Sequence, residues 1–269
     1  MKRNRLSLGL VLSSLVAVAA CEDKPAPKQA PDQPAVTAAP APPPTPTAAA
    51  EPAPKPAAER KPKKKLEDCP KGPTVSFDDK AFEEEVRRKL PKPDGAITSA
   101  DLAKLRSLNV SQLKLAELDV CVFPHMKGLK ELFLGPGEYD DLSPIAGALQ
   151  LESLRASISQ VHDLKPLAKL TRLDRLDLGR TQVADLTPIA SLKKLTELQL
   201  DDTKVEDLSP LAGLSLLETL SLKRTRVKDA SPLKGLKKLK IVYTGGSALD
   251  ADPMAVAPLR ANGTKIVAD

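Results

Sequence analysis

The sequence predicts an α/β solenoid, in which short coils stack around an aliphatic core with a parallel sheet along the inner face. A helical cap is expected at the N-terminal end, with a disordered tether ahead of it. Three observations predict this fold: leucine returns every 22 residues, leucines alternate with polar residues inside each repeat, and prolines are concentrated before the repeats. The chain of 269 residues has no Trp, 2 Tyr and 4 Phe, so its core must be aliphatic.

The 22-residue interval is the main evidence for stacked coils. Leucine occupies the first place of every repeat, and in the first five repeats it also fills the fourth place. The sixth place of those five is Leu as well, except for Ala156. Alternation between places four and six is typical of a short strand with one buried face. The first-place leucines are Leu129, Leu151, Leu173, Leu195, Leu217 and Leu239.

An aspartate and a proline follow each predicted strand at constant spacing. The aspartate is expected to cap a tight turn or a short 3₁₀ segment, and the proline three residues later fixes the backbone as the segment begins. One coil alone cannot bury its apolar side, so neighbouring coils must share their stability and their strands should form one parallel sheet. The pairs are Asp141 and Pro144, Asp163 and Pro166, Asp185 and Pro188, Asp207 and Pro210, and Asp229 and Pro232.

These registers resemble the leucine-rich repeat family, in the 22-residue variety of internalin-like bacterial surface proteins. The whole motif stands intact over residues 195–211, and the resemblance covers roughly residues 75–260. It implies an arc that binds other proteins through its inner face. The usual Asn of the ninth place, which can satisfy backbone groups where the chain leaves the strand, is replaced here. The replacements are Gly137, Ser159, Thr181, Thr203 and Thr225.

Both ends of the repeat array are expected to carry caps. Residues 69–128 form the predicted N-terminal cap with an irregular first repeat of 24 residues, and 129–250 form the repeats. An amphipathic helix is predicted from Asp78 to Leu90, because acidic residues precede basic ones and Pro91 closes it. Residues 251–269 form the predicted C-terminal cap, in which 265–267 have the pattern of a closing strand.

The first twenty residues are predicted to be a secretory signal. Basic residues precede an apolar run, Leu6–Val18, which is too short to span roughly 30 Å of hydrocarbon. The sequence Val18-Ala19-Ala20-Cys21 resembles the lipobox of bacterial lipoproteins, which implies cleavage before Cys21 and lipidation of its thiol. The protein is therefore expected to be exported and anchored by lipid in a bacterial envelope, with inner or outer membrane undetermined. The alternative is an ordinary signal that leaves Cys21 as a free thiol.

Residues 21–68 are predicted to be a disordered tether. The segment from Glu22 to Leu66 holds 13 of the 26 prolines and few side chains that could form a core. It ends in a basic cluster from Arg60 to Lys65, which could attract anionic lipid or a cell-wall polyanion. The alternative interpretation is a solvated linker end.

Two further cysteines, Cys69 and Cys121, remain if Cys21 is lipidated. They lie before the cap helix and in the irregular first repeat. In an exported protein, a disulfide between them would join the cap to the first coil. The alternative is two separate thiols.

Composition excludes several classes of function. Residues 70–269 carry 30 basic and 28 acidic side chains, without the concentrated basic face of a nucleic-acid-binding domain. The only two histidines, His125 and His162, lie in different repeats with no metal-ligand spacing around them. We therefore expect no cofactor, no metal, no nucleic acid and no catalysis.

The inner face is the candidate site. Its outward-pointing strand positions are polar and of mixed charge, and Arg155 and Arg175 are the best candidates for binding hot spots. The predicted function is non-catalytic binding of an unknown protein; the alternative is a structural envelope module that holds polyanionic cell wall through its tether. The predicted partner-binding residues are Phe133, Arg155, Arg175, Asp177, Glu197 and Gln199, within a row that also includes Glu131, Asp201, Lys223 and Tyr243.

Overall fold

The structure, a computed structural model, describes residues 63–268, which belong to one compact unit. The predicted signal sequence, Cys21 and residues 22–62 of the tether lie outside the described residues. Residues 63–68, which we assigned to the tether, belong to the folded unit instead. Among the described residues, no helix is long and apolar enough to cross a membrane.

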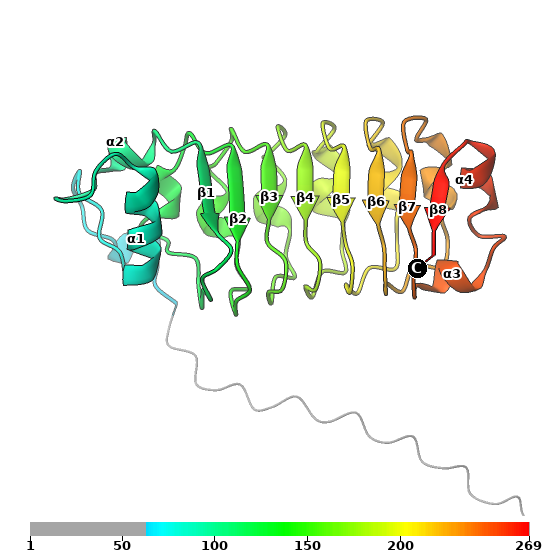
Figure 1. Cartoon of the computed structure of the whole chain (residues 1–269), viewed down its shortest axis with the longest axis horizontal. Helices are drawn as coiled ribbons and strands as arrows, with labels where there is room; N and C mark the ends of the chain where they lie inside the picture. The colour runs from blue at the N-terminus through cyan, green and yellow to red at the C-terminus, as the bar shows by residue number, and fades with distance from the viewer. Residues whose placement is uncertain (1–62, 269) are drawn as a thin grey trace, which may run out of the picture. The chain divides into compact units, whose positions relative to one another are not determined.

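Within residues 63–268, eight strands pair side by side in chain order to form one parallel sheet (Figure 1). Consecutive strands from β2 to β7 pair at an offset of 22 residues, as the repeat predicts. The offset is 24 at both ends, where Ser107 pairs with Glu131 and Ile241 with Lys265. The strands are β1 (Ser107–Val110), β2 (Glu131–Leu134), β3 (Ser153–Arg155), β4 (Arg175–Asp177), β5 (Glu197–Gln199), β6 (Thr219–Ser221), β7 (Ile241–Tyr243) and β8 (Lys265–Val267).

One face of every coil is packed with leucine. The fourth-place leucines are at most 1% exposed, and the first-place leucines are similarly buried. Because the side chains of a strand alternate between its two faces, the residues beside each buried leucine point to solvent. The predicted aliphatic core is confirmed, and this alternation leaves one face of the sheet open for contact with other molecules.

Short 3₁₀ helices form the opposite side of the coils, and the repeated aspartate starts each of them. In every repeat the carboxylate accepts a hydrogen bond from the backbone N–H two residues later; the distance is 2.7 Å from Asp141 to Ser143 and 2.9 Å from Asp163 to Lys165. Proline follows at the second helical position. The helices are η3 (Ser143–Ile145), η4 (Lys165–Leu167), η5 (Thr187–Ser191), η6 (Ser209–Gly213) and η7 (Ser231–Gly235).

The turns out of β3, β4, β5 and β6 are each fixed by a buried hydroxyl at the ninth place. Thr203 donates to the Leu200 carbonyl oxygen at 2.6 Å, and the other ninth-place hydroxyls make the equivalent bond three residues back. The eighth place precedes this hydroxyl and has a left-handed backbone, with φ between 53° and 58° in four non-glycine residues. These residues are Ile158, Arg180, Asp202 and Arg224.

The first repeat lacks the ninth-place hydroxyl and makes a different bond at this turn. Gly137 has no side chain to donate, but the buried Tyr139 hydroxyl donates to the Gly135 carbonyl oxygen at 3.2 Å. Burial raises the pKa of Tyr139 to about 12, so the phenol stays protonated as this bond requires. A Cβ at Gly137 would collide with the Leu115 carbonyl oxygen and lie 2.8 Å from the Tyr139 ring. The glycine therefore makes room for the tyrosine.

The N-terminal cap consists of η1 (Leu66–Asp68), α1 (Lys80–Lys89) and α2 (Ser99–Leu102), followed by β1 and η2 (Phe123–His125). Asp79 caps α1 by accepting from Ala81 and Phe82, and the buried Phe82 stacks on Phe123 at 5.2 Å between ring centroids. In the structure a disulfide joins Cys69 and Cys121. The predicted cap helix is confirmed, two residues shorter at its start and one residue shorter at its end than expected.

At the other end, α3 (Ala248–Ala251) and α4 (Ala257–Ala261) replace the 3₁₀ segment of the regular repeats and lead into β8. The predicted closing strand is confirmed. The residues after 250 therefore complete a further coil rather than only covering the last one. The boundary at residue 250 between repeats and cap remains a prediction.

Candidate functional site

The candidate site is the solvent-facing side of the sheet, which we call the inner face. It is formed by the outward-pointing residues of the strands, which lie in two rows across the sheet. Register places Phe133, Arg155, Asp177 and Gln199 side by side in one row, and Arg175 beside Glu197 in the other. All six predicted partner-binding residues therefore lie together on strands β2 to β5.

Arg155 and Asp177 form an ion pair at the centre of this group. The Arg155 Nε donates to Asp177 Oδ2 at 3.0 Å, while Asp177 Oδ1 accepts from the Gly179 backbone N–H. The Arg155 side chain is still 51% exposed, and its two terminal nitrogens make no hydrogen bond to any residue between 63 and 268. The aspartate therefore orients the guanidinium group and leaves its end available for a ligand.

Arg175 is less constrained. Its side chain is 64% exposed, and its Nε lies 3.7 Å from a carboxylate oxygen of Asp174. Next to it, Gln199 Nε2 donates to Glu197 Oε1 at 2.7 Å. The patch thus offers two exposed guanidinium groups beside acidic and amide side chains, an arrangement suited to hydrogen bonding with another protein surface.

Aromatic rings stand near both ends of the row. Phe133 is half-buried on β2, and Tyr243 is half-buried on β7 with the Lys223 ammonium 5.1 Å from its ring centre. The Lys223 ammonium and the Tyr243 ring are therefore already partners of each other in a cation–π contact. Phe133 has no such neighbour within the described residues and leaves part of its ring open beside Arg155.

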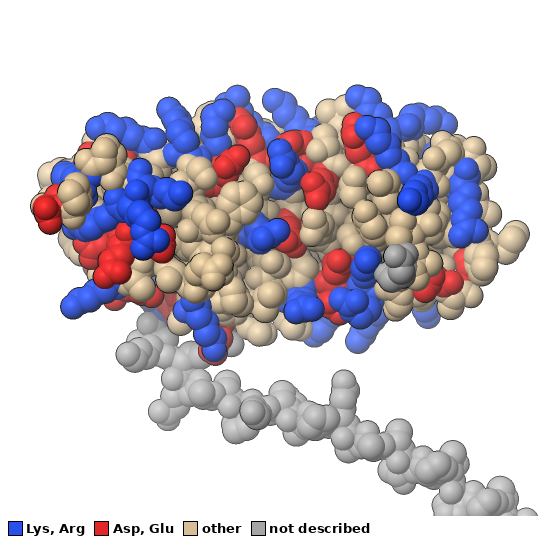
Figure 2. All heavy atoms as spheres, in the orientation of Figure 1, with Lys and Arg blue, Asp and Glu red and all other residues tan. Residues whose placement is uncertain are grey.

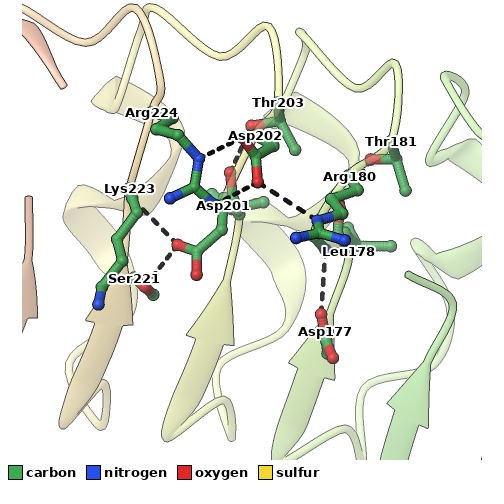
Figure 3. A network of polar contacts seen from close by, with 12 residues as sticks. Asp177, Leu178, Arg180, Thr181, Asp201, Asp202, Thr203, Ser221, Lys223 and Arg224 are labelled. Carbon is green, nitrogen blue, oxygen red and sulfur yellow. Dashed lines mark hydrogen bonds and ion pairs between the residues drawn. The ribbon is translucent and has the colours of Figure 1, made fainter. Parts of the chain in front are cut away.

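A second polar network lies where the strands end (Figure 3). The Arg224 Nε lies 2.5 Å from Asp202 Oδ1, and the Arg180 Nε lies 3.5 Å from Asp202 Oδ2. The hydrogen bond from Arg224 holds the pKa of Asp202 below its usual range. The neighbouring Asp201 accepts from the Ser221 hydroxyl at 2.5 Å. Sequence reasoning missed this network, although the alternation of Arg, Asp and Arg at the eighth place of three successive repeats was a visible signal.

The mixed charge of this side of the molecule is visible in Figure 2, where Lys and Arg stand beside Asp and Glu. Among residues 63–268, no three His, Cys, Asp or Glu side chains are grouped so that they could hold a metal ion. The inner face presents groups that can form hydrogen bonds, ion pairs and aromatic contacts.

Comparisons with known proteins agree with this architecture. The family model described as Leucine Rich repeats (2 copies) matches residues 171–213. The solved structure of an internalin C2 from Listeria monocytogenes is 27% identical with a TM-score of 0.55, and the match covers 71% of this chain and 92% of that chain. An internalin (InlF) from the same species is 24% identical with a TM-score of 0.53.

The match to the InlF structure covers 64% of this chain and 57% of that one, so the chain spans a little over half the length of that protein. No curated protein matches the sequence.

Proposed function

We propose that this chain, a leucine-rich repeat protein of the internalin-like type, binds another protein through its inner face without catalysis. The observation that carries the proposal is the patch on β2 to β5, where the exposed end of Arg155 lies beside Phe133 and the exposed Arg175 lies beside Glu197 in the second row. Arginine near the centre of a surface is a frequent hot spot of protein interfaces.

The geometry supports binding more than reaction chemistry. The charged groups of the patch pair with one another, as Arg155 does with Asp177, and this fixes their positions. A preorganised surface loses less side-chain entropy when a partner binds. The partner expected from this chemistry presents carboxylate groups to the two arginines and an apolar side chain to Phe133.

The envelope location is part of the same proposal. The signal sequence and the lipobox-like segment ending at Cys21 support export and lipid anchoring, and the proline-rich residues 22–62 support a spacer between the anchor and the repeats. Two acyl chains would hold the protein stably on a membrane. Mass spectrometry of the mature protein tests whether the Cys21 thiol carries acyl chains.

The basic cluster at the end of the tether gives less support to the polyanion alternative. The Lys63 Nζ lies 2.5 Å from Asp140 Oδ1, and the Lys64 Nζ lies 2.8 Å from Asp78 Oδ2. Hydrogen bonding to Asp78 raises the pKa of Lys64 above its ordinary value. The ammonium of Lys65 also lies 3.5 Å from a carboxylate oxygen of Glu67. Because these three lysines already have acidic neighbours, the cluster presents less free charge than its sequence suggests.

The test is a crosslinking pull-down from whole envelopes with three proteins: wild type, Arg155→Glu with Arg175→Glu, and the control Lys204→Glu with Lys228→Glu. The control makes the same charge change at exposed lysines outside the inner face. We expect wild type and control to capture the same protein and the arginine variant to lose it. Equal capture by all three, or capture dominated by wall material, would overturn the proposal.

A further inference from the structure

The segments that lead into the strands carry most of the surplus positive charge of the repeats. Together they hold eight basic and three acidic residues over 127–130, 149–152, 171–174, 193–196, 215–218 and 237–240. We call this surface the basic edge. Its basic residues are Lys127, Lys130, Arg172, Lys193, Lys194, Lys237, Lys238 and Lys240.

The opposite edge of the sheet has the reverse balance. The loops that leave β2 to β6 hold six basic and ten acidic residues over 135–141, 157–163, 179–185, 201–207 and 223–229. The near-neutral repeat domain is therefore polarised from one edge to the other. Figure 2 shows Lys and Arg side chains in a row along the upper border, where the strands begin.

Much of this positive charge is free to meet a ligand. All eight basic side chains are exposed. Two of them pair with acids of the same edge: Lys130 with Glu152 at 3.0 Å, and Lys240 with Glu218 at 2.6 Å. Within residues 63–268, no ion pair or hydrogen bond engages the side chains of Lys127, Lys194, Lys237 and Lys238.

The same edge also exposes a large apolar side chain. Leu149 is 50% exposed, at the place in its repeat that Lys127 and Lys193 occupy in theirs. Neighbouring strands lie about 4.8 Å apart, so cations stand within one or two coils of this leucine. Basic side chains around an exposed leucine are typical of surfaces that touch anionic headgroups and insert shallowly between them.

We propose that the basic edge docks on an anionic lipid bilayer. A row of cations repeated along stacked coils presents its charges to a plane, and each Lys or Arg held close to an anionic membrane strengthens the binding. The proposed lipid on Cys21 would keep the domain within tether reach of such a surface. Docking by this edge leaves the inner face open, so the proposal does not depend on a protein partner binding there.

The test measures sedimentation with vesicles. The full chain carries Cys21→Ser, so that no acyl group is attached there. It is mixed with neutral vesicles or with vesicles that contain phosphatidylglycerol, an anionic lipid that attracts Lys and Arg. Only the difference in binding between the two vesicle types is interpreted. The edge variant is Lys194→Glu, Lys237→Glu, Lys238→Glu; the control is Lys114→Glu, Lys204→Glu, Lys228→Glu, at exposed lysines on the other edge.

We expect the edge variant to bind anionic vesicles about a hundredfold more weakly than the parent chain, and the control to bind within a few-fold of it. Leu149→Ser should weaken vesicle binding several-fold and leave retention on heparin resin unchanged. Equal losses in the edge and control variants would overturn the proposal. The proposal would also be overturned if the parent chain bound neutral and anionic vesicles equally. The same holds if heparin resin retained the parent chain but Leu149→Ser left its vesicle binding unchanged.

Discussion

At the scale of single residues, hydrogen-bonding side chains stabilise the turns of the coils, whereas the leucines form the buried core. Thr181, Thr203 and Thr225 each donate to the carbonyl three residues back, in the place where related repeats use Asn. The first repeat has neither, and Tyr139 supplies the hydroxyl from two residues further along. Tyr139 bonds the carbonyl of the seventh place rather than that of the sixth, so what the repeats share is a buried hydroxyl that satisfies one backbone carbonyl of the turn.

The pairing of Gly137 with Tyr139 leads to a prediction about glycine. Gly137→Ala should destabilise the domain by about 2–3 kcal/mol, because the new methyl group collides with backbone and with the Tyr139 ring. Gly147→Ala is the control, since a Cβ there meets nothing within 4 Å, and it should change stability by less than about 1 kcal/mol. Urea unfolding of the two variants measures both, and similar losses would show that Gly137 is not needed for space.

At the scale of elements, 3₁₀ helices η5 to η7 begin after an aspartate that accepts a hydrogen bond from the start of the helix. Hydrogen bonds from the hydroxyl and the backbone N–H two residues later lower the pKa of Asp185, Asp207 and Asp229. A carboxyl group whose pKa is lower in the folded state than in the unfolded chain stabilises the fold above the unfolded value, about 3.9. That stabilisation is lost as the pH falls through the folded pKa.

The domain should therefore lose stability as the pH falls below about 4. In the variant Asp185→Asn, Asp207→Asn, Asp229→Asn, the amide oxygens can still accept the backbone bonds but cannot be protonated in this range. We expect the free energy of unfolding of this variant to depend less on pH between 5 and 3 than that of wild type. Urea titrations at several pH values measure it, and identical slopes would refute the role assigned to these carboxylates.

Prediction from sequence succeeded for elements with a period and failed where contacts are not periodic. The strands, the 3₁₀ segments and the irregular 24-residue first repeat follow from spacing, since each coil repeats the same contacts. The packing of Tyr139 against Gly137 depends on shape, and Lys63 pairs with Asp140, which is 77 residues away in the chain. The six inner-face residues could be placed because alternation fixes their side; what they bind could not.

At the scale of the whole molecule, the N-terminal cap is joined to the coils by the bond between Cys69 and Cys121. The bond closes a loop of 52 residues, and in the chain-entropy model it contributes about 4 kcal/mol by restricting the unfolded chain. The cap helix covers the edge of the sheet beside β1. Losing the bond should therefore loosen this end of the domain first.

Intact mass spectrometry of protein isolated from envelopes checks this bond together with the anchor. The mass should lack residues 1–20, carry acyl chains on Cys21 and show no thiol that alkylates before reduction. After reduction, Cys69 and Cys121 should both alkylate. Alkylation of both without reduction would leave the cap joined to the coils by packing alone.

The measurement that tests the central claim most directly is site-specific photo-crosslinking in living cells. A photoreactive amino acid replaces Arg175 on the inner face or, as the control, Lys228, which is exposed on the loop after β6. If the inner face is the recognition surface, the probe at 175 gives a discrete adduct with one protein and the probe at 228 does not. Adducts with the same protein from both positions, or none from 175, would contradict the account.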